Sequence, residues 1–506
     1  MASSVWNGLP RLPWNRHPDV VEGLVLSGGG SRASFQIGAL RYLYDVVGIK
    51  PQVVVGTSAG SILGAMIAQH ADPDDQAQAV RTIERLWYGM DQQSDMFTER
   101  PWFTRLRRRG TDWMALLQRE AARPAPSWSL PRLNVPFLSR DEDADPAEHP
   151  DSSVVGEQTA DPEELTGQAE TLRLAMDDTV PTGLGWTPSM AMGLMSMLPR
   201  LRGASGDLSL ILRGADATRS MYHPGPILAA LLDPEVFAAD AVSRSGITAR
   251  FAIVGLHSGA LHFMREDGRI VDRDDRLLSD DVHDVSRGVL ASCSIPAVFR
   301  PVEIGGEWYI DGGTREYLPA EMAIGHLGAS RCYVVSSGAT GLQPATGFDT
   351  KSMLTVMMRA TEILSDEGSR DEVAYARNAG AMVIEPEFNV HDPLTVDPGL
   401  IRIARDYGWL RAAEAHLELS RAERSIHREI IELRCHAHTL EAARLAARKS
   451  LDEPDTLDEL AEVKTRIRHL LTRVRPEVLP EDAEQWWQSA EAHPRAASEH
   501  VAQLGD

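Results

Sequence analysis

Two buried-strand patterns, each ending in glycine and each followed by a helical pattern, lie within the first 70 residues. An apolar run at 23–27 ends in glycines, and apolar residues with helical spacing cover 32–47. A second run at 51–55 is followed by a helical pattern of small and apolar residues over 58–69. Parallel neighbours need a crossover connection, usually a helix, so this order predicts a parallel sheet with helices packed against it.

The rest of the chain continues these patterns and then becomes helical. From about residue 400 it is rich in Ala, Leu, Glu and Arg with helical spacing, and Pro454 and Pro476 divide this tail into three expected helices. We therefore expect the α/β class, as a three-layer α/β/α domain with a mainly parallel sheet and an α-helical C-terminal extension. Further strands are expected at 247–255, 260–264, 307–310, 331–336 and 381–385, and further helices at 74–90, 281–291, 318–327 and 351–379.

The composition predicts three parts and one insertion. Residues 1–20 are expected to form an irregular leader, 21–395 the main domain and 396–506 the helical extension. Within the main domain, 91–219 is expected to be an insertion. Its segment 140–178 holds 13 Asp and Glu against two Arg. Such a segment cannot bury enough apolar surface to offset the entropy of ordering it, so we expect the insertion to be partly disordered.

Two stretches of this insertion have the composition of lipid-contacting segments. The uncharged stretch 179–199 is long enough to cross a bilayer, but three prolines and three glycines argue against a continuous spanning helix. Its four methionines and Trp186 suit an adaptable apolar surface, with a core-covering loop as the alternative. The basic and aromatic stretch 102–109 suits an anionic membrane surface, with a solvated helix end as the alternative. We expect the insertion to act as a lid.

The net charge of −22 at pH 7 argues against a nucleic-acid partner, because phosphate contacts need clustered cations. The same charge opposes strong adsorption to anionic lipid, so membrane contact should be transient and peripheral. Three widely spaced cysteines exclude a disulfide scaffold and a cysteine-rich zinc site and fit a reducing compartment. The first 20 residues contain no continuous apolar segment, so no signal peptide is expected. We predict a cytoplasmic protein.

Three consecutive glycines, Gly28, Gly29 and Gly30, stand between the first strand pattern and its helix, with Arg32 just beyond them. Glycines let the backbone approach a ligand closely, and amide groups at the start of a helix favour negative charge. The motif suits a phosphate or an oxyanion. A plain strand-to-helix turn is the alternative.

The second strand-to-helix turn carries a serine, in the sequence Gly56-Thr57-Ser58-Ala59-Gly60. A sharp turn of this kind exposes the hydroxyl in a strained conformation and needs small residues at Gly56 and Gly60. The bare pattern is weak in a chain of this length, but the valines before it and the helical pattern after it supply the structural context. We predict that Ser58 is a nucleophile.

A third motif, Asp311-Gly312-Gly313, follows the strand pattern at 307–310. An aspartate at a strand end beside two glycines can point into a cleft and accept a proton from a neighbouring hydroxyl. Taken alone, Asp-Gly is more often a turn. The motif therefore gains its weight from the other two.

The sequence gives less support to other ligand-binding and catalytic arrangements. A dinucleotide-binding fold needs a carboxylate at the end of the second strand, where this chain has no acidic residue. A P-loop needs a Gly-Lys-Ser or Gly-Lys-Thr sequence, which is missing. A Ser-His-Asp triad stays open, although the spacing of the 16 histidines singles out none. Four histidines lie in the half of the chain where a triad histidine would be expected: His257, His262, His283 and His326.

Together with the sequence ASCSIPAVFRP at 291–301, the three motifs resemble the patatin-like phospholipase family. The resemblance covers about residues 21–90 and 220–390, and it explains neither the insertion nor the tail. The first motif departs from the family's frequent Gly-x-Gly-x-x-Gly at its last position, which is Ala33 here. Alanine is small enough for the same helix–strand packing.

The resemblance implies a Ser-Asp dyad without histidine, in which Ser58 is the nucleophile and Asp311 the general base. It also implies a lipid acyl-ester hydrolase of the phospholipase A or lysophospholipase type, with no metal and no cofactor. The backbone of Gly28, Gly29 and Gly30, with Arg32 nearby, would form the oxyanion hole, and Gly56, Gly60, Gly312 and Gly313 would support the motifs.

Two other functions would keep the same residues. An acyl-enzyme that passes its acyl group to an acceptor other than water would be an acyltransferase. A non-catalytic protein could keep the fold and bind a partner through its helices. The C-terminal helices over about 400–475 could cover the main domain, pair with a second copy of the chain or recruit another protein, and the sequence leaves these three roles open.

Overall fold

The computed structural model describes residues 20–105, 217–231, 233, 236–342, 353–446, 454–488 and 490–491. Nearly all of the expected leader, and the acidic and uncharged stretches of the expected insertion, lie outside the described residues. The lid and the partial disorder therefore stay predictions. The chain divides into two units, and nearly all described residues belong to the first. The first unit comprises 1–103, 201–344 and 359–506, and the second comprises 104–200 and 345–358.

The centre of the first unit is a nine-stranded sheet. Its strands are β1 (Glu22–Leu26), β2 (Val53–Thr57), β5 (Thr248–Gly255), β6 (Leu261–Arg265), β7 (Ile270–Asp272), β8 (Val302–Ile304), β9 (Glu307–Asp311), β10 (Arg331–Val335) and β11 (Met382–Ile384). The main path runs β11-β10-β1-β2-β5-β6-β7, while β9 pairs with β5 and β8 with β9. The strands from β11 to β5 are parallel, and the others join by antiparallel pairing. A separate pair joins β3 (Phe97–Glu99) to β4 (Tyr222–Pro224).

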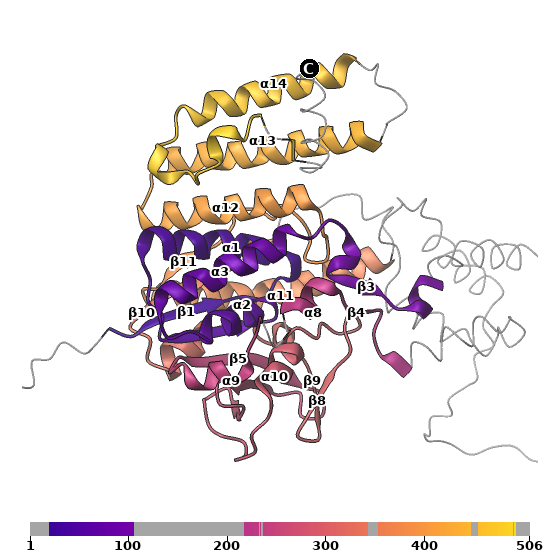
Figure 1. Cartoon of the computed structure of the whole chain (residues 1–506), viewed down its shortest axis with the longest axis vertical. Helices are drawn as coiled ribbons and strands as arrows, with labels where there is room; N and C mark the ends of the chain where they lie inside the picture. The colour runs from indigo at the N-terminus through magenta and orange to yellow at the C-terminus, as the bar shows by residue number, and fades with distance from the viewer. Residues whose placement is uncertain are drawn as a thin grey trace, which may run out of the picture. The chain divides into compact units, whose positions relative to one another are not determined.

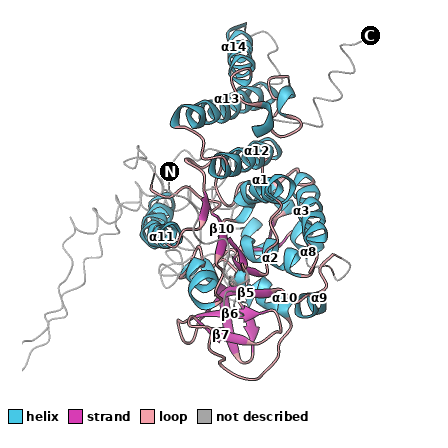
Figure 2. Ribbon diagram, turned by 90° about the vertical axis from the view of Figure 1, so that its left-hand side faces the viewer, coloured by secondary structure: helices cyan, strands magenta, loops and turns pink. Residues whose placement is uncertain are grey.

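Helices cover both faces of the sheet (Figures 1 and 2). On one face, Val54 and Phe251 lie against Gly64 of α2 (Ala59–Ala68). On the other face, Val53 and Val55 belong to an apolar cluster with α11 (Met353–Asn378), which Figure 2 shows across the sheet from α2. The predicted three-layer α/β/α class is confirmed. The other α-helices among the described residues are α1 (Ala33–Tyr42), α3 (Pro73–Tyr88), α8 (Pro226–Leu231), α9 (Ala239–Arg244), α10 (Val285–Ser292), α12 (Pro398–His416), α13 (Arg421–Ala446) and α14 (Pro454–Leu471).

The helical tail differs in detail from the sequence prediction. Pro454 is the first residue of α14, where a proline is well tolerated because the first helical N–H has no intrahelical partner. The break between α12 and α13 contains neither proline nor glycine; instead Glu418 has a positive φ of 49°. The helix expected at 318–327 is present over 320–326, mostly as the π-helical turn Met322–His326.

The first helix of the tail packs closely on the main domain. A Cβ added to Gly38 of α1 would lie 1.7 Å from the backbone oxygen of Arg405 in α12, and one added to Gly408 would lie 1.9 Å from the backbone oxygen of Phe35. The two helix backbones therefore approach to a separation that only glycine permits. Helices α13 and α14 follow beyond α12 (Figure 1). Helix α12 thus covers the main domain, which is one of the three roles left open for the tail. The other two roles, self-association and partner binding, stay predictions.

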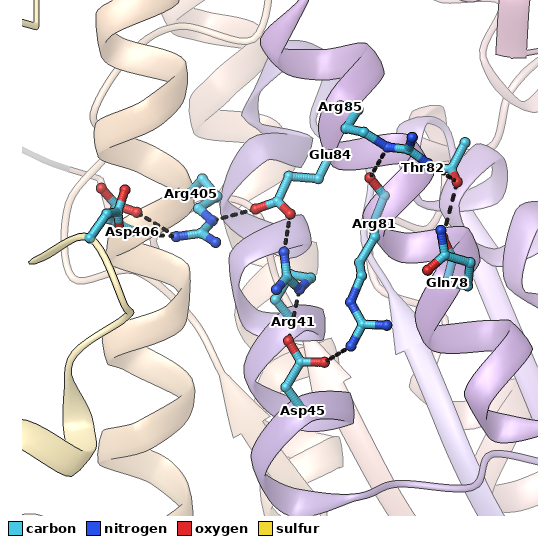
Figure 3. A network of polar contacts seen from close by, with 10 residues as sticks. Arg41, Asp45, Gln78, Arg81, Thr82, Glu84, Arg85, Arg405 and Asp406 are labelled. Atoms are coloured by element: carbon cyan, nitrogen blue, oxygen red, sulfur yellow. Dashed lines mark hydrogen bonds and ion pairs between the residues drawn. The ribbon is translucent and has the colours of Figure 1, made fainter.

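Buried ion pairs join the same helices (Figure 3). Glu84 of α3 lies between Arg41 of α1 and Arg405 of α12, and the Nε of Arg405 lies 2.6 Å from the Glu84 carboxylate. Arg405 also contacts Asp406 at 2.8 Å, and Asp406 contacts Arg434 of α13 at 2.7 Å. Removing one member would leave a buried charge without its partner, so the network favours this one arrangement of helices.

Among the described helices, none is both long enough and apolar enough to span a bilayer.

We expect Gly38→Ala to lower the free energy of unfolding by about 1–3 kcal/mol, because the methyl group must displace the backbone of α12. Urea unfolding followed by circular dichroism measures the change. Gly368→Ala is the matched control, because Gly368 is exposed in α11 with open space beside it. There alanine should raise stability by about 1 kcal/mol through its helix propensity. Equal changes in the two variants would contradict the close packing of α1 and α12.

Candidate active site

Ser58 occupies the turn between β2 and α2 in a strained conformation. Its φ is 52° and its ψ is −125°, and it is 5% exposed. A positive φ on a residue other than glycine costs on the order of 1–3 kcal/mol and persists only where the surroundings hold it. A Cβ on Gly56 would lie 2.5 Å from the oxygen of Gly60, and a Cβ on Gly60 would lie 2.4 Å from the oxygen of Leu26. Both flanking positions therefore require glycine.

The pairing of β5 brings Ser58 and Asp311 together. On the edge of β5 opposite β6, Ala252 pairs with Thr57, the last residue of β2, and Ile253 pairs with Asp311, the last residue of β9. Strands β2 and β9 therefore run toward each other along one edge of β5, and their ends meet. Ser58 follows Thr57 directly, so the two predicted site residues lie side by side although 253 positions separate them in the sequence.

Asp311 is buried and only half engaged in hydrogen bonds. Its Oδ1 accepts the backbone N–H of Gly313 at 2.7 Å, whereas Oδ2 has no hydrogen-bond partner among the described residues. Burial raises the pKa of this carboxyl from 3.8 to about 7, and hydrogen bonding from Ser58 and Gly313 opposes the rise. The Ser58 hydroxyl thus acts on the carboxyl, but the contact is looser than a hydrogen bond of standard geometry.

The glycine loop lies against the serine. A Cβ on Gly28 would be 3.4 Å from the Cβ of Ser58. The N–H of Gly28 already donates to the backbone oxygen of Tyr317 at 3.0 Å, so it is not available to an oxyanion. Gly29 and Gly30 both have positive φ, 154° and 55°. The predicted oxyanion donors therefore narrow to the amides of Gly29 and Gly30.

Arg32 and the glycines after Asp311 have separate structural contacts. The Nε of Arg32 donates to the backbone oxygen of His391 at 2.7 Å, which turns this side chain toward the loop that follows β11. A Cβ on Gly312 would lie 2.5 Å from the oxygen of Ala252, so this position requires glycine beside β5. Gly313 contributes the N–H that orients Asp311.

Sequence reasoning missed three residues that contact both halves of the site. The Oγ of Ser292 accepts the N–H of Ser58 at 2.9 Å, and the Sγ of Cys293 donates to the Ser58 oxygen at 3.1 Å. The backbone oxygen of Ser294 accepts the N–H of Asp311 at 3.0 Å. These residues lie in the 291–301 stretch that carries the family resemblance, but no pattern in that stretch reveals which side chain contacts the serine.

The described residues support neither a Ser-His-Asp triad nor a metal site. Among the described residues, no histidine makes a hydrogen bond or ion pair with Ser58 or Asp311. The Nδ1 of His262 lies 3.4 Å from the Tyr309 hydroxyl, and the His283 ring lies beside Gly305. Within the same described part of the chain, no group of three or more His, Cys, Asp or Glu is placed to hold a metal ion.

A family model for the patatin-like phospholipases matches residues 24–324, which is more than half of the chain and includes Ser58 and Asp311. The chain therefore belongs to the patatin-like phospholipase family.

Over 50 residues the chain is 50% identical to lysophospholipase NTE1 of Chaetomium globosum, a stretch that is 10% of this chain and only 3% of that relative's length. Among solved structures, VipD from Legionella pneumophila is 12% identical with a TM-score of 0.27, over 95% of this chain and 93% of that one. The type III effector ExoU is 14% identical with a TM-score of 0.22, over 96% and 76%. With scores this low, the fold assignment rests on the sheet and helices of the chain itself.

The buried carboxyl of Asp311 should make stability depend on pH. Its pKa is 3.8 when unfolded and about 7 when folded, so the folded state binds the proton more tightly. The resulting stabilisation is complete at low pH and is lost as the pH rises through about 7. We expect the free energy of unfolding of wild type, minus that of Asp311→Asn, to fall by on the order of 4 kcal/mol between about pH 4 and about pH 8.

Urea unfolding at several pH values measures this difference. Burial raises the pKa of Glu316 to about 7 and that of Glu372 to about 8, so both carboxyls titrate in the same pH range. Their contribution to the pH dependence is the same in both proteins and cancels in the subtraction. A difference that stays constant with pH would contradict a raised pKa at Asp311.

Proposed function

We propose that this chain hydrolyses acyl esters of lipids, with Ser58 as the nucleophile and Asp311 as the general base. The observation that carries the proposal is the pairing of a strained serine with a buried carboxyl whose Oδ2 has no other described partner. A carboxyl with a pKa of about 7 can hold and release a proton near neutral pH, which is what a general base must do. Membership of the patatin-like phospholipase family supports an ester of a lipid as the substrate.

In the first half of the reaction, the Oγ of Ser58 attacks the ester carbonyl carbon while Asp311 takes the hydroxyl proton. The carbonyl π electrons move onto oxygen and form a tetrahedral oxyanion. When this intermediate collapses, the bond to the leaving alcohol breaks and Asp311 returns the proton to that oxygen. The products are the free alcohol or lysolipid and an acyl ester on Ser58, so atoms and charge balance without a cofactor.

The amides of Gly29 and Gly30 are the donors that we assign to the oxyanion. They lie at the start of the short helical turn Gly30–Arg32 that leads into α1, directly after Gly28, which lies against Ser58. N–H groups at such a start favour negative charge. Because the Ser337 side chain and the Pro393 backbone pack against this loop, the donors are fixed before the substrate binds. Loss of one such donor typically costs about 100-fold to 1,000-fold in kcat.

In the second half of the reaction, a water molecule replaces the alcohol. Asp311 removes one of its protons, the hydroxide oxygen attacks the acyl carbon, and the returning proton restores the Ser58 hydroxyl as the fatty acid leaves. If another alcohol takes the place of water, the same steps make the chain an acyltransferase.

Transient membrane contact and a cytoplasmic location remain part of the proposal, as does a partner or a second copy bound through the C-terminal helices.

The proposal predicts that wild type hydrolyses at least one member of a panel of phospholipids, lysophospholipids and neutral glycerides, and that Ser58→Ala and Asp311→Asn do not. Mass spectrometry of the released fatty acids measures turnover. Adding a lysolipid or an alcohol separates the two enzyme functions, because a transferase forms a new ester at the expense of free fatty acid. Full turnover by Asp311→Asn would show that another group is the base. Turnover by none of the proteins would support a non-catalytic binding role.

The activity should also depend on pH through Asp311. The base must be ionised to accept the serine proton, so kcat/KM should rise with pH through a midpoint of about 7. Initial rates on a soluble short-chain ester, whose own aggregation does not change with pH, give this profile. A midpoint near 4, the ordinary range for an aspartate, would contradict a buried base.

A further inference from the structure

Three consecutive residues at the end of α10, Ser292, Cys293 and Ser294, bind the backbone of both predicted catalytic residues. Ser292 accepts the N–H of Ser58, Cys293 donates to the Ser58 oxygen, and Ser294 accepts the N–H of Asp311. We call this segment the site clip. It is the one described segment outside the strand pairing whose hydrogen bonds reach both halves of the site.

The position of the clip matches the place where strand pairing ends. Thr57 and Asp311 are the last paired residues of β2 and β9, and Ser58 lies one position beyond the pairing. Its φ of 52° is unfavourable for serine, so contacts outside the sheet must hold it. Ser292 satisfies the Ser58 N–H, and Cys293 shares the Ser58 oxygen with the N–H of Ser61.

The direction of these hydrogen bonds makes the Ser292 hydroxyl difficult to replace. Its oxygen accepts the Ser58 N–H at 2.9 Å, and the same oxygen lies 2.8 Å from the Oγ of Ser61. One hydroxyl therefore connects the turn residue to the first turn of α2. Ser292 and Ser61 are 0% exposed, so water cannot substitute for the lost partner.

Cys293 has the protonation state that this contact requires. Burial, with the Asp311 carboxylate nearby, raises the pKa of the thiol well above its usual value. The thiol therefore stays protonated and donates to the Ser58 oxygen rather than acting as a second nucleophile.

We propose that Ser292 is a positioning residue, which acts through the site clip to hold Ser58 at the strained turn and within reach of Asp311. This inference rests on the proposed function for its effect on catalysis, but its structural part stands independently. Misplacing a reacting group by about 1 Å can cost about 100-fold in rate, while ground-state binding of the substrate need not change. The inference therefore predicts a loss in kcat and none in KM.

The test uses the full chain with Ser292→Ala and a matched control, Ser336→Ala. Ser336 is also a fully enclosed serine, 1% exposed, and its hydroxyl donates to the backbone oxygen of Gly338 at 2.9 Å. We expect Ser292→Ala to lower kcat about 100-fold with KM unchanged, and Ser336→Ala to lower the melting temperature without lowering kcat. A kcat loss in Ser292→Ala no larger than in the control would overturn the inference.

A double-mutant cycle with Ser61→Ala tests the hydroxyl connection itself. If Ser292 acts partly through Ser61, the double variant should lose little more kcat than Ser292→Ala alone. Losses that multiply independently would overturn this connection.

Hydrogen exchange of the peptide covering 56–61 supplies a readout that needs no substrate. In Ser292→Ala the exchange of this peptide should accelerate relative to wild type and to Ser336→Ala, because the Ser58 N–H loses its acceptor. Unchanged exchange would overturn the site clip even if the chain is an active hydrolase. Faster exchange in a chain that turns over no lipid ester would uphold the clip and reject the proposed function.

Discussion

The site depends on one pairing arrangement in the sheet. Two neighbouring residues of β5, Ala252 and Ile253, pair on the same edge with the last residues of two other strands, Thr57 and Asp311. Because β2 runs parallel to β5 and β9 runs antiparallel to it, the ends of the two strands meet. A shift of one residue in the pairing of β9 with β5 would turn Asp311 to the other face of the sheet and separate it from Ser58. The glycines of the three motifs then allow the backbones to approach at this point.

Burial disfavours the ionised form of Asp311 in the folded state, and the same burial makes the carboxylate a stronger base. A solvated aspartate is a weak base, whereas enclosure beside Ser58 raises the pKa of Asp311 to about 7. The strain at Ser58 has a similar character, since the conformation that exposes a nucleophile must be held by neighbours. The site clip, the glycine contacts and the end of β5 together supply that restraint. Local instability is thus concentrated where the chemistry is proposed.

Much of this arrangement could be predicted from the sequence. The valine-rich strands, the glycine turns and the family resemblance predict Ser58 as nucleophile and Asp311 as general base, and the sheet places these two residues side by side. The three-residue strands β7 and β8 were missed because each contains only two apolar residues, whereas the equally short β11 lies in the continuous apolar run 381–384. The predicted set of oxyanion donors was too large, because the N–H of Gly28 donates to the backbone oxygen of Tyr317, which is distant in the sequence. Ser292 and the contact of α12 with α1 were beyond prediction for the same reason, because tertiary packing alone decides them.

The central claim is that Ser58 is made nucleophilic by Asp311. Peptide mapping of the chain after reaction with a fluorophosphonate, followed over time, tests it most directly. The account predicts a single covalent adduct, located on Ser58, whose rate of formation falls by at least about 100-fold in Asp311→Asn. An adduct on a different serine, or one that forms on Ser58 at the same rate in Asp311→Asn, would contradict the account.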